Sequence, residues 1–460
     1  MKMENFELSV ETINKFNVPG PRYTSYPTAP EWKDDFTENN YFKILNDFGA
    51  KDEPLSIYVH IPFCESLCWY CGCNVKISKN REKANDYIDY LFKEIDTVAS
   101  KFEKKKEITQ FHWGGGTPTF MNEEQIAKLF RKIQDSFDLN LDEEVAIEVD
   151  PRTIDHHKLK VLRNLGFNRV SMGVQDFNPK VQEAVNRVHS FELVKSHYDY
   201  CRELGFRSVN LDLIYGLPFQ TVENFAESVE LVCDLRPDRV ALYSYAHLPW
   251  LKPHMKLIHE TDLPSTEEKF KIFLKSREIF MKRGYLTIAM DHFALETDEM
   301  AKAFMNGTLH RNFMGYTLKP AENFIGFGVS SIGYLENCFI QNTKDLNEYY
   351  QMIDDGNLPL ERGKILKEDD LMRQWTINSL MCKFKVDKNE FKQKFEIDFD
   401  TYFEYEKEHL QNCEKEDLLK LKDDKIIISP IGRLFIRNVC MGFDWYFRQQ
   451  GAHKKFSKTV

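Results

Sequence analysis

Short apolar runs recur along the first two thirds of the chain and alternate with amphipathic stretches. Each run is largely apolar or β-branched, as expected for strands that a parallel sheet buries on both faces. The expected strands are residues 55–60, 108–113, 144–149, 169–175, 208–215 and 239–245. Helical periodicity between them is clear over 85–102 and over 123–136, where Asn122 is a candidate N-cap. This βα rhythm predicts an α/β fold.

Six βα units predict a partial (βα)6 barrel, open rather than closed by eight strands. We assign it to residues 51–360. Residues 1–50 are irregular and polar, and we expect them to form an arm over the active site, with Arg22, Tyr23 and Tyr26 either facing a pocket or lying on the surface. Residues 361–460 predict a smaller, mainly helical, winged-helix-like domain. Its expected elements are helices over 368–382, 388–395, 399–410 and 431–447 and a hairpin turning at 423–424.

Composition narrows the functional class. The chain has 460 residues, 42% of them hydrophobic and 13% aromatic, which indicates a globular protein. A net charge of −10 argues against nonspecific nucleic-acid binding but leaves room for an anionic substrate in a local basic pocket. No apolar run reaches the roughly 18 residues that span a bilayer, and no signal-peptide core is visible. We therefore expect a cytoplasmic protein without a membrane span.

Four of the ten cysteines lie within ten residues, spaced C-x3-C-x2-C-x-C: Cys64, Cys68, Cys71 and Cys73. Such a cluster of thiols requires a metal, a disulfide or redox chemistry. Structural zinc sites usually combine two separated pairs, and no second pair is present. The spacing therefore favours an iron–sulfur cluster, with zinc and an inert loop as the alternatives. Three cysteines would hold three corners of the cluster and leave one iron open, whereas the fourth thiol either has no ligand role or faces the active site.

Polar residues follow each expected strand. Because reactive groups of barrel folds lie at the carboxyl ends of the strands, we expect these residues to share one site. They are the triple glycine 114–116 with Thr117, then Glu148 and Asp150, Gln175, Asp212, and the 245–249 segment. His292 is expected to be a satisfied core histidine, and residues 326–333 a close-packed strand and turn lining the pocket.

The cysteine loop, entered from a strand and carrying an aromatic residue before its third cysteine, resembles the radical S-adenosylmethionine (SAM) superfamily. Longer motifs narrow the resemblance to the oxygen-independent coproporphyrinogen III oxidases. These motifs are residues 20–29, 72–74, 112–119, 171–178, 186–189, 212–218, 310–313, 432 and 437–441.

The resemblance implies a [4Fe-4S] cluster held by Cys64, Cys68 and Cys71, with SAM chelating the fourth iron. It also implies a second SAM molecule. Matching positions for the cluster-bound SAM are Tyr58, Gly115, Glu148 and Ile332, and those for the second are Tyr70, Gly116, Thr117, Gln175, Arg187, Asp212 and Ala246. Position 70 is often Phe in the family and is Tyr here. Cys73 and Tyr58 are the candidate catalytic residues.

The implied reaction is the oxidative decarboxylation of the ring A and ring B propionates of coproporphyrinogen III to vinyl groups. It would begin with hydrogen abstraction by a 5′-deoxyadenosyl radical and give protoporphyrinogen IX in anaerobic haem biosynthesis. Arg22 and Arg311 are the candidate partners of the substrate carboxylates, since guanidinium forks match carboxylates. A low-potential donor such as flavodoxin or ferredoxin would supply electrons, and we expect a monomer.

Three alternatives remain at this point: a haem-binding or haem-trafficking relative, a radical SAM porphyrin methyltransferase, and a structural zinc protein. Trafficking relatives usually have an aromatic residue at the position of Cys73 and lack the 20–29 segment. This chain has both the cysteine and the segment, which favours the decarboxylase.

Overall fold

A twelve-stranded sheet dominates the computed structural model, which describes residues 9–33, 36–318, 323–450 and 456–459. Its strand order is β16-β15-β14-β13-β1-β4-β5-β6-β7-β8-β10-β9. The six predicted strands form its parallel centre, as β1 (Leu55–Ile61), β4 (Glu107–Gly115), β5 (Asp138–Val149), β6 (Arg169–Gln175), β7 (Ser208–Tyr215) and β8 (Arg239–Ser244). The α/β prediction is therefore confirmed, although β5 begins at Asp138 rather than at residue 144.

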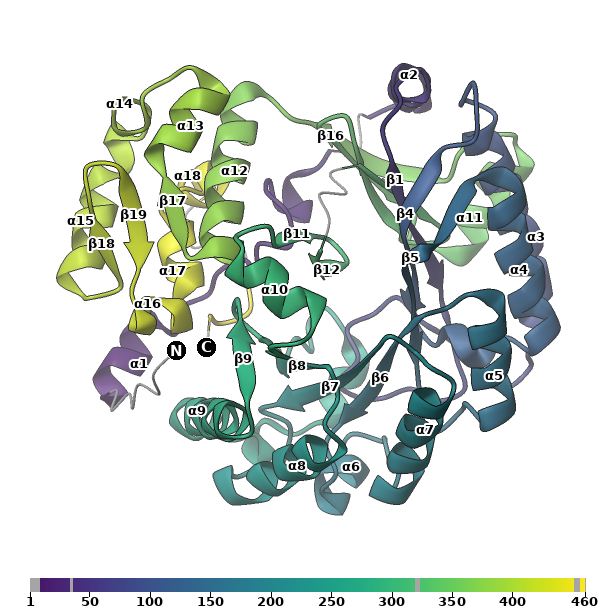
Figure 1. Cartoon of the computed structure of the whole chain (residues 1–460), viewed down its shortest axis with the longest axis horizontal. Helices are drawn as coiled ribbons and strands as arrows, with labels where there is room; N and C mark the ends of the chain where they lie inside the picture. Colours follow the sequence, from purple (N-terminus) through teal and green to yellow (C-terminus); the bar gives the residue numbers. More distant parts are fainter. Residues whose placement is uncertain (1–8, 34–35, 319–322, 451–455, 460) are drawn as a thin grey trace.

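Helices cover the convex outer face of this sheet (Figure 1). They are α3 (Lys83–Ala99), α4 (Glu123–Ser136), α5 (His156–Leu165), α6 (Pro179–Ala184), α7 (Phe191–Glu203), α8 (Val222–Leu235) and α9 (Thr266–Lys282). Asn122 caps α4 as predicted: its side chain accepts from the Gln125 amide at 2.9 Å, and the Gln125 side chain accepts from the Asn122 amide at 2.9 Å. Together with the six parallel strands, the helices form the predicted partial (βα)6 barrel.

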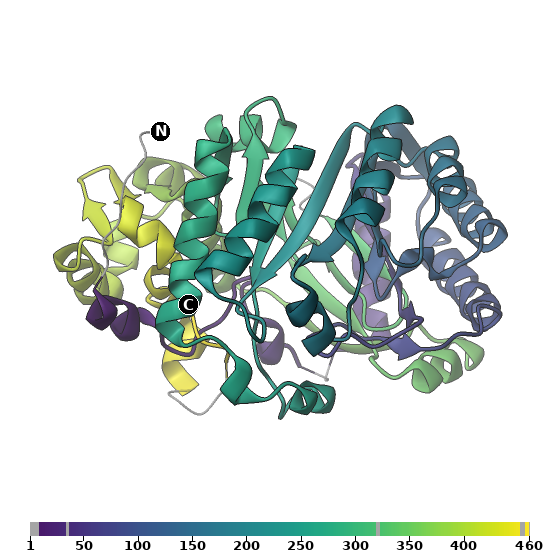
Figure 2. The same ribbon diagram turned by 90° about the horizontal axis from the view of Figure 1, so that it is seen from below.

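Further strands extend both edges of the parallel centre. On one side β13 (Phe324–Phe327) pairs in parallel with β1, followed by antiparallel β14 (Ile332–Leu335), β15 (Cys338–Asn342) and β16 (Leu360–Ile365). On the other side β10 (His292–Leu295) and β9 (Tyr285–Ile288) are antiparallel. The seventh parallel strand, β13, was not predicted as such. Within the described residues the edge strands β16 and β9 do not pair with each other, so the sheet stays open (Figure 2).

The C-terminal part forms a separate layer beside the open edges (Figure 1). It contains α12 (Glu368–Lys383), α13 (Lys388–Phe395), and a small sheet of β17 (Lys385–Asp387), β19 (Lys425–Ile428) and β18 (Leu419–Leu421). The predicted helices 368–382 and 388–395 and the hairpin are confirmed. The third strand, β17, was not predicted. This helix and hairpin arrangement agrees with the winged-helix-like prediction.

Two predictions of a single long helix near the C-terminus are wrong, because the structure divides each stretch into shorter elements. Residues 399–410 divide into α14 (Phe399–Tyr402), a 3-10 turn over Glu404–Glu406, and α15 (Lys407–Lys415). The break lets Phe403 and the carboxylate of Glu406 both be buried, the latter against Arg373 and Arg448. Residues 431–447 divide into α16 (Pro430–Leu434), α17 (Ile436–Met441) and α18 (Trp445–Gln450), with non-helical backbone at Phe435.

The first fifty residues are less irregular than predicted. They contain α1 (Val10–Phe16) and α2 (Glu38–Gly49), and the buried positions 41, 45 and 48 of α2 follow the helical period. Most of the 20–26 segment is buried, although Arg22 is exposed. Tyr23 and Tyr26 are each 1% exposed and share a hydrophobic core with the C-terminal helices. The segment is therefore integrated into the fold rather than lying on the surface.

Within the described residues, no helix has both the length and the apolar composition that a bilayer crossing requires.

Candidate active site

The cysteine loop starts where the first barrel strand ends. Cys64 closes β2 (Phe63–Cys64), which pairs in parallel with β3 (Lys76–Ile77), so a two-stranded ladder brackets the loop between them. The Lys76 amide donates to the Pro62 carbonyl at 2.7 Å, and the Ser78 amide donates to the Cys64 carbonyl at 2.9 Å. This ladder fixes the two ends of the loop at the carboxyl edge of the parallel strands.

One cavity collects most of the predicted site residues. Its lining includes Cys64, Cys68, Tyr70, Cys71, Cys73, Gly115, Gly116, Thr117, Glu148, Gln175, Arg187 and Asp212. Most of them come from the loop and from the ends of β4, β5 and β6, whereas Asp212 lies within β7 and Arg187 follows α6. The expectation of one shared site is therefore confirmed for the residues after β4, β5 and β6, but the 245–249 segment does not line this cavity. Tyr58, Ala246 and Ile332 are not part of this lining.

The sulfurs of the loop face different partners. Cys64 Sγ lies 3.3 Å from Thr117 Oγ1, whereas Cys68 Sγ faces two guanidinium groups. Among the residues that the structure describes, no three His, Cys, Asp or Glu side chains converge on a single metal ion. In an iron–sulfur cluster each cysteine binds its own iron, and Cys64, Cys68 and Cys71 all line this cavity. The loop therefore fits a [4Fe-4S] group.

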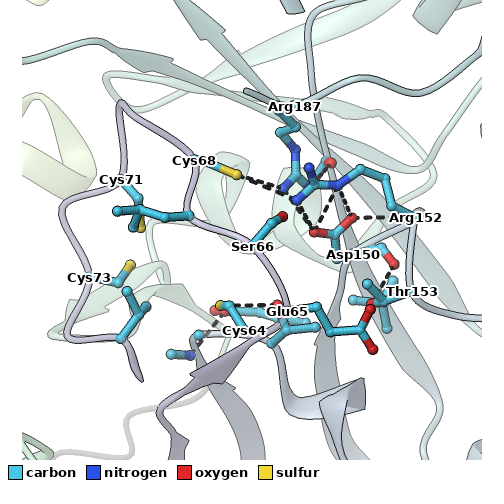
Figure 3. Close-up of a pocket in the computed structure, with 18 of the residues that line it drawn as sticks. Cys64, Glu65, Ser66, Cys68, Cys71, Cys73, Asp150, Arg152, Thr153 and Arg187 are labelled. Carbon is cyan, nitrogen blue, oxygen red and sulfur yellow. Dashed lines mark hydrogen bonds and ion pairs between the residues drawn. The ribbon is translucent and has the colours of Figure 1, made fainter. Parts of the chain in front are cut away.

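Cys68 is flanked by an ion-pair network at the end of β5 (Figure 3). Asp150 Oδ2 lies 2.7 Å from Arg152 Nη2 and 2.9 Å from Arg187 Nη1. The same two nitrogens lie 3.4 and 3.5 Å from Cys68 Sγ. Burial opposes ionisation of Asp150, but the two guanidinium groups hold its pKa well below the usual range. The network presents positive charge to the Cys68 sulfur.

Sequence analysis did not identify Arg152 as a site residue. The one feature of the sequence that indicates a site role for Arg152 is its position two residues after Asp150, next to the end of an expected strand. The side chain folds back on Asp150, with Nε 3.0 Å from Oδ1, and this brings the guanidinium to the cavity wall.

Glu148 is held on the opposite wall. Its Oε1 lies 3.2 Å from His112 Nε2, and its Oε2 accepts from the Gly115 amide at 3.2 Å. Burial raises the carboxyl pKa, but the bond and charge of His112 outweigh it, so the pKa of Glu148 is lowered. Gly115 has φ of +114°, and a Cβ there would lie 2.6 Å from the His60 ring, which explains the glycine.

Tyr58 lies behind this wall rather than in it. Its hydroxyl is 3.2 Å from His60 Nδ1, and its ring stacks on His112 with centroids 5.9 Å apart. The His112 ring in turn contacts Glu148. Tyr58 thus supports the imidazoles that position the Gly115 and Glu148 wall.

Two polar atoms of the cavity lining have no hydrogen-bond partner among the described residues. Gln175 Oε1 and Arg187 Nε are buried and form no hydrogen bond in the described structure. Gln175 also adopts φ of 70°, an uncommon left-handed conformation for a residue with a side chain. Buried polar groups are normally satisfied, so these atoms indicate a polar ligand.

Asp212, within β7, also lines the cavity. It accepts hydrogen bonds from Ser171 Oγ at 2.9 Å and from Asn210 Nδ2 at 2.7 Å. Burial, with the nearby charge of Glu148, raises the pKa of Asp212 to about 6.

The thiols themselves are electrostatically distinct. Burial raises the pKa of Cys64 to about 12. A hydrogen bond between the side chains of Cys71 and Cys73 lowers the pKa of Cys71 and raises that of Cys73. Because metal ligation requires the thiolate, a bound cluster would replace the protons of the ligating thiols. The six remaining cysteines are buried, and none forms a disulfide among the described residues.

A second cavity adjoins the strand ends β7 and β8 and contains both predicted substrate arginines, Arg22 and Arg311. Arg22 donates to the Ser244 carbonyl at 3.0 Å. Arg311 comes from the hairpin of β11 (His310–Asn312) and β12 (Gly315–Thr317), and its Nε and Nη1 are buried without a partner in the part of the chain that the structure describes. A buried guanidinium with free donors is suited to a carboxylate.

His292 differs partly from its prediction. It is satisfied, since Nδ1 lies 2.7 Å from Asp291 Oδ1, but both residues line the second cavity rather than the core. Residues 326–333 form a strand and turn as predicted, but they do not line the cysteine cavity or the second cavity.

Comparisons with known proteins agree with this geometry. Residues 58–232 match the family described as the radical SAM superfamily, and residues 366–435 match the HemN C-terminal domain. The chain is 42% identical over 460 residues to the oxygen-independent coproporphyrinogen III oxidase of Escherichia coli (strain K12), covering 100% of both chains. It is 41% identical to that of Synechocystis, covering 99% of this chain and 98% of the relative.

A solved structure is similar over nearly the whole chain. The coproporphyrinogen III oxidase (HemN) from Escherichia coli, described as a radical SAM enzyme, superposes with a TM-score of 0.90 at 43% identity. The match covers 93% of this chain and 98% of that one.

Proposed function

Because the chain belongs to the oxygen-independent coproporphyrinogen III oxidases, we propose that the cavity lined by the cysteine loop generates the radical. The second cavity, which contains the two predicted substrate arginines, binds the substrate in this proposal. The enzyme oxidises coproporphyrinogen III by radical SAM chemistry in haem biosynthesis. In our proposal the ring A and ring B propionates become vinyl groups, and the product is protoporphyrinogen IX.

The observation that carries the proposal is the placement of Cys64, Cys68 and Cys71 on one wall of a cavity lined by strand-end polar groups. These three cysteines would hold the [4Fe-4S] cluster. When bound, the cluster and SAM supply one-electron chemistry that removes a hydrogen atom from an unactivated carbon. The protein residues bind and orient the reactants and exclude water.

The unpartnered atoms of Gln175 and Arg187 and the acceptors of Glu148 and Asp212 suit the amino, carboxylate and ribose groups of SAM. We propose that Glu148 and Gly115, supported by Tyr58, contact a SAM molecule at the cluster, together with Ile332. Residues proposed for a second SAM molecule are Tyr70, Gly116, Thr117, Gln175, Arg187, Asp212 and Ala246. Cys73, at the end of the loop, lines the same cavity and is not proposed as a ligand.

Arg152 has a positioning role in this proposal. Together with Arg187 it directs positive charge at the Cys68 sulfur. Hydrogen bonds to a cluster sulfur stabilise the reduced, more negative state, and thus raise the reduction potential.

The second cavity is proposed for the substrate. Arg311, with its free buried donors, would bind one propionate, and Arg22 would bind another from the 20–29 segment. We also propose a monomer composed of an arm over residues 1–50, a catalytic domain over 51–360 and a C-terminal domain over 361–460. Thiolate ligands need a reducing compartment, for which the cytoplasm is the proposed location.

The direct test is anaerobic incubation of the reconstituted, reduced protein with SAM and coproporphyrinogen III, with the products separated by chromatography. We expect protoporphyrinogen IX together with 5′-deoxyadenosine and methionine. SAM cleavage without a vinyl product would mean a different substrate, and haem binding without SAM cleavage would support the trafficking alternative.

A further inference from the structure

Two basic segments flank the cysteine loop on the protein surface. The first, residues 76–83, contains Lys76, Lys79, Arg81 and Lys83 with one acidic residue, Glu82. The second, residues 249–259, contains Lys252, His254, Lys256 and His259 and no acidic residue. We call these two segments together the loop-flanking surface. Its basic character contrasts with the net charge of −10 for the whole chain.

Both segments are attached directly to the loop. Lys252 Nζ donates to the Cys73 carbonyl at 3.0 Å, and His254 Nε2 bonds to the Cys71 carbonyl at 2.8 Å. On the other side, Lys76 and Ile77 form the β3 strand that pairs with Cys64. The loop-flanking surface therefore contacts the backbone that carries two of the three proposed cluster ligands.

Some of these charges are already compensated. Arg81 forms an ion pair with Glu65 at 2.8 Å, and Lys76 lies close enough to Asp345 to lower its pKa. Lys79 and Lys256 are exposed, one in each segment. Positive charge is therefore displayed on both sides of the loop.

The same segments expose apolar side chains. Leu251 is 64% exposed, Leu257 53% and Ile77 46%. Single exposed apolar residues are ordinary, but three of them beside a redox site provide apolar area that a docked partner protein would cover. A small-molecule reductant would need no apolar contact.

We infer that the loop-flanking surface is the docking site of a small, acidic one-electron carrier protein. Opposite charge would steer the carrier to the surface of an otherwise acidic enzyme, and the apolar residues would hold it there briefly. One electron leaves the reduced carrier and is accepted at the cluster site, with no bond formed and no proton moved. The inference rests on the proposed function because it requires a reducible cluster.

The test compares two reductants on the same cluster-loaded enzyme. A flavodoxin in its hydroquinone form serves as the acidic carrier, and dithionite serves as a reductant that needs no docking site. The variant K79E/K256E reverses one exposed charge in each segment. The control K160E/K420E makes the same change in net charge at exposed positions on α5 and β18. The rate of cluster reduction is followed by stopped-flow absorbance, and carrier binding is measured separately by biolayer interferometry.

We expect K79E/K256E to slow reduction by flavodoxin about tenfold at low ionic strength, with the difference shrinking as salt is added. Binding should weaken in parallel, and dithionite reduction should stay at the wild-type rate. The control should behave like the wild type. A further variant, L251S/L257S, should weaken carrier binding with little salt dependence.

Unchanged flavodoxin kinetics in K79E/K256E would overturn the inference, as would an equal loss with both reductants, which would indicate damage to the cluster loop. An equal effect of K160E/K420E would also overturn it, because net charge rather than a docking site would then be responsible. If the wild-type protein binds no cluster at all, the proposed function fails instead, so the two failures are distinguishable.

Discussion

Arg152 Nη2 lies 3.4 Å from the sulfur of Cys68 while the same nitrogen is 2.7 Å from Asp150 Oδ2. Arg187, in the loop that follows α6, makes the same bridge to Cys68 and Asp150. Two buried or half-buried cations share one carboxylate, so a net positive charge faces a single proposed cluster ligand. This geometry stabilises negative charge on the sulfur.

Replacing Arg152 should therefore change the cluster more than the fold. R152Q removes one donor to Cys68, so we expect a more negative reduction potential and a changed electron paramagnetic resonance spectrum of the reduced cluster. R152K should lie between R152Q and the wild type. A redox titration followed by spectroscopy measures this without relying on turnover. R131Q, at an exposed position of α4, is the matched control, and an R152Q potential equal to the wild type would contradict the assignment.

Serine variants of the four loop cysteines should differ in how much iron they bind. C64S, C68S and C71S should each lose most of the roughly four irons expected per chain, because each would remove a thiolate ligand. C73S should keep its iron, since Cys73 is proposed to line the cavity without ligating the cluster. Iron and sulfide analysis after anaerobic reconstitution checks both expectations. Loss of iron from C73S would make it a ligand and overturn this division.

Arg311 should contribute to substrate affinity through its unpartnered donors. A hydrogen bond to a charged group contributes about 1.5–3 kcal/mol, so R311Q should raise KM for coproporphyrinogen about 10–100-fold. R311K keeps the positive charge but lacks the paired donors of the guanidinium group, so it should raise KM for coproporphyrinogen by less than R311Q does. The KM for SAM should not change in either variant. An unchanged substrate KM in R311Q would remove Arg311 from the substrate site.

Glu94 should make stability depend on pH. It is buried on α3, where it accepts from Tyr349 Oη at 2.6 Å, from the Gly328 amide at 2.9 Å and from Asn342 Nδ2 at 2.7 Å. Burial nevertheless raises its pKa to about 7. The folded state therefore binds this proton more tightly than the unfolded state, whose pKa is near 4.5. The associated stabilisation is complete below about pH 4.5 and is lost as pH rises through 7, by about 3 kcal/mol at most.

The variant E94Q cannot titrate, so the difference in Tm between wild type and E94Q should fall from pH 5 to pH 8. Thermal unfolding across this range measures it. E124Q, at an exposed position of α4, is the control and should track the wild type at every pH. A constant difference between wild type and E94Q would contradict the raised pKa.

Tyr23 should anchor the 20–26 segment to the C-terminal helices. Its hydroxyl donates to Asp444 Oδ2 at 3.1 Å, and both residues are buried. Y23F removes one hydrogen-bond donor from that buried carboxylate. This should lower the free energy of unfolding by about 1–3 kcal/mol and speed hydrogen exchange in residues 19–26. Y405F removes a phenol that is 80% exposed and should have no effect. Unchanged exchange in Y23F would contradict this anchoring role, because other contacts, such as those of Arg437 with the Gly20 and Pro21 carbonyls, would then be sufficient to hold the segment.

The elements that sequence predicted best are those with a strong local period. The six apolar strands and the capped helix α4 needed only side-chain patterning and one capping box. The short helices were predicted less well, because tertiary packing decides where they break. Phe435 interrupts a helical pattern that has no proline or glycine at that point, and the burial of Glu406 against Arg373 breaks another.

The sequence by itself determined the cysteine loop, the order of the strand-end motifs and the family, because these depend on residue type and spacing along the chain. Only the tertiary structure placed Arg152 and Arg187 on the Cys68 sulfur and joined residues 20–26 to the core of the C-terminal helices. It also shows that Tyr58 lies behind the cavity wall and that Arg311 has donors inside a cavity without a partner among the described residues. The physical reason is that spacing fixes which residues are neighbours along the chain, whereas distances between side chains on different strands depend on sheet register and on how the layers pack.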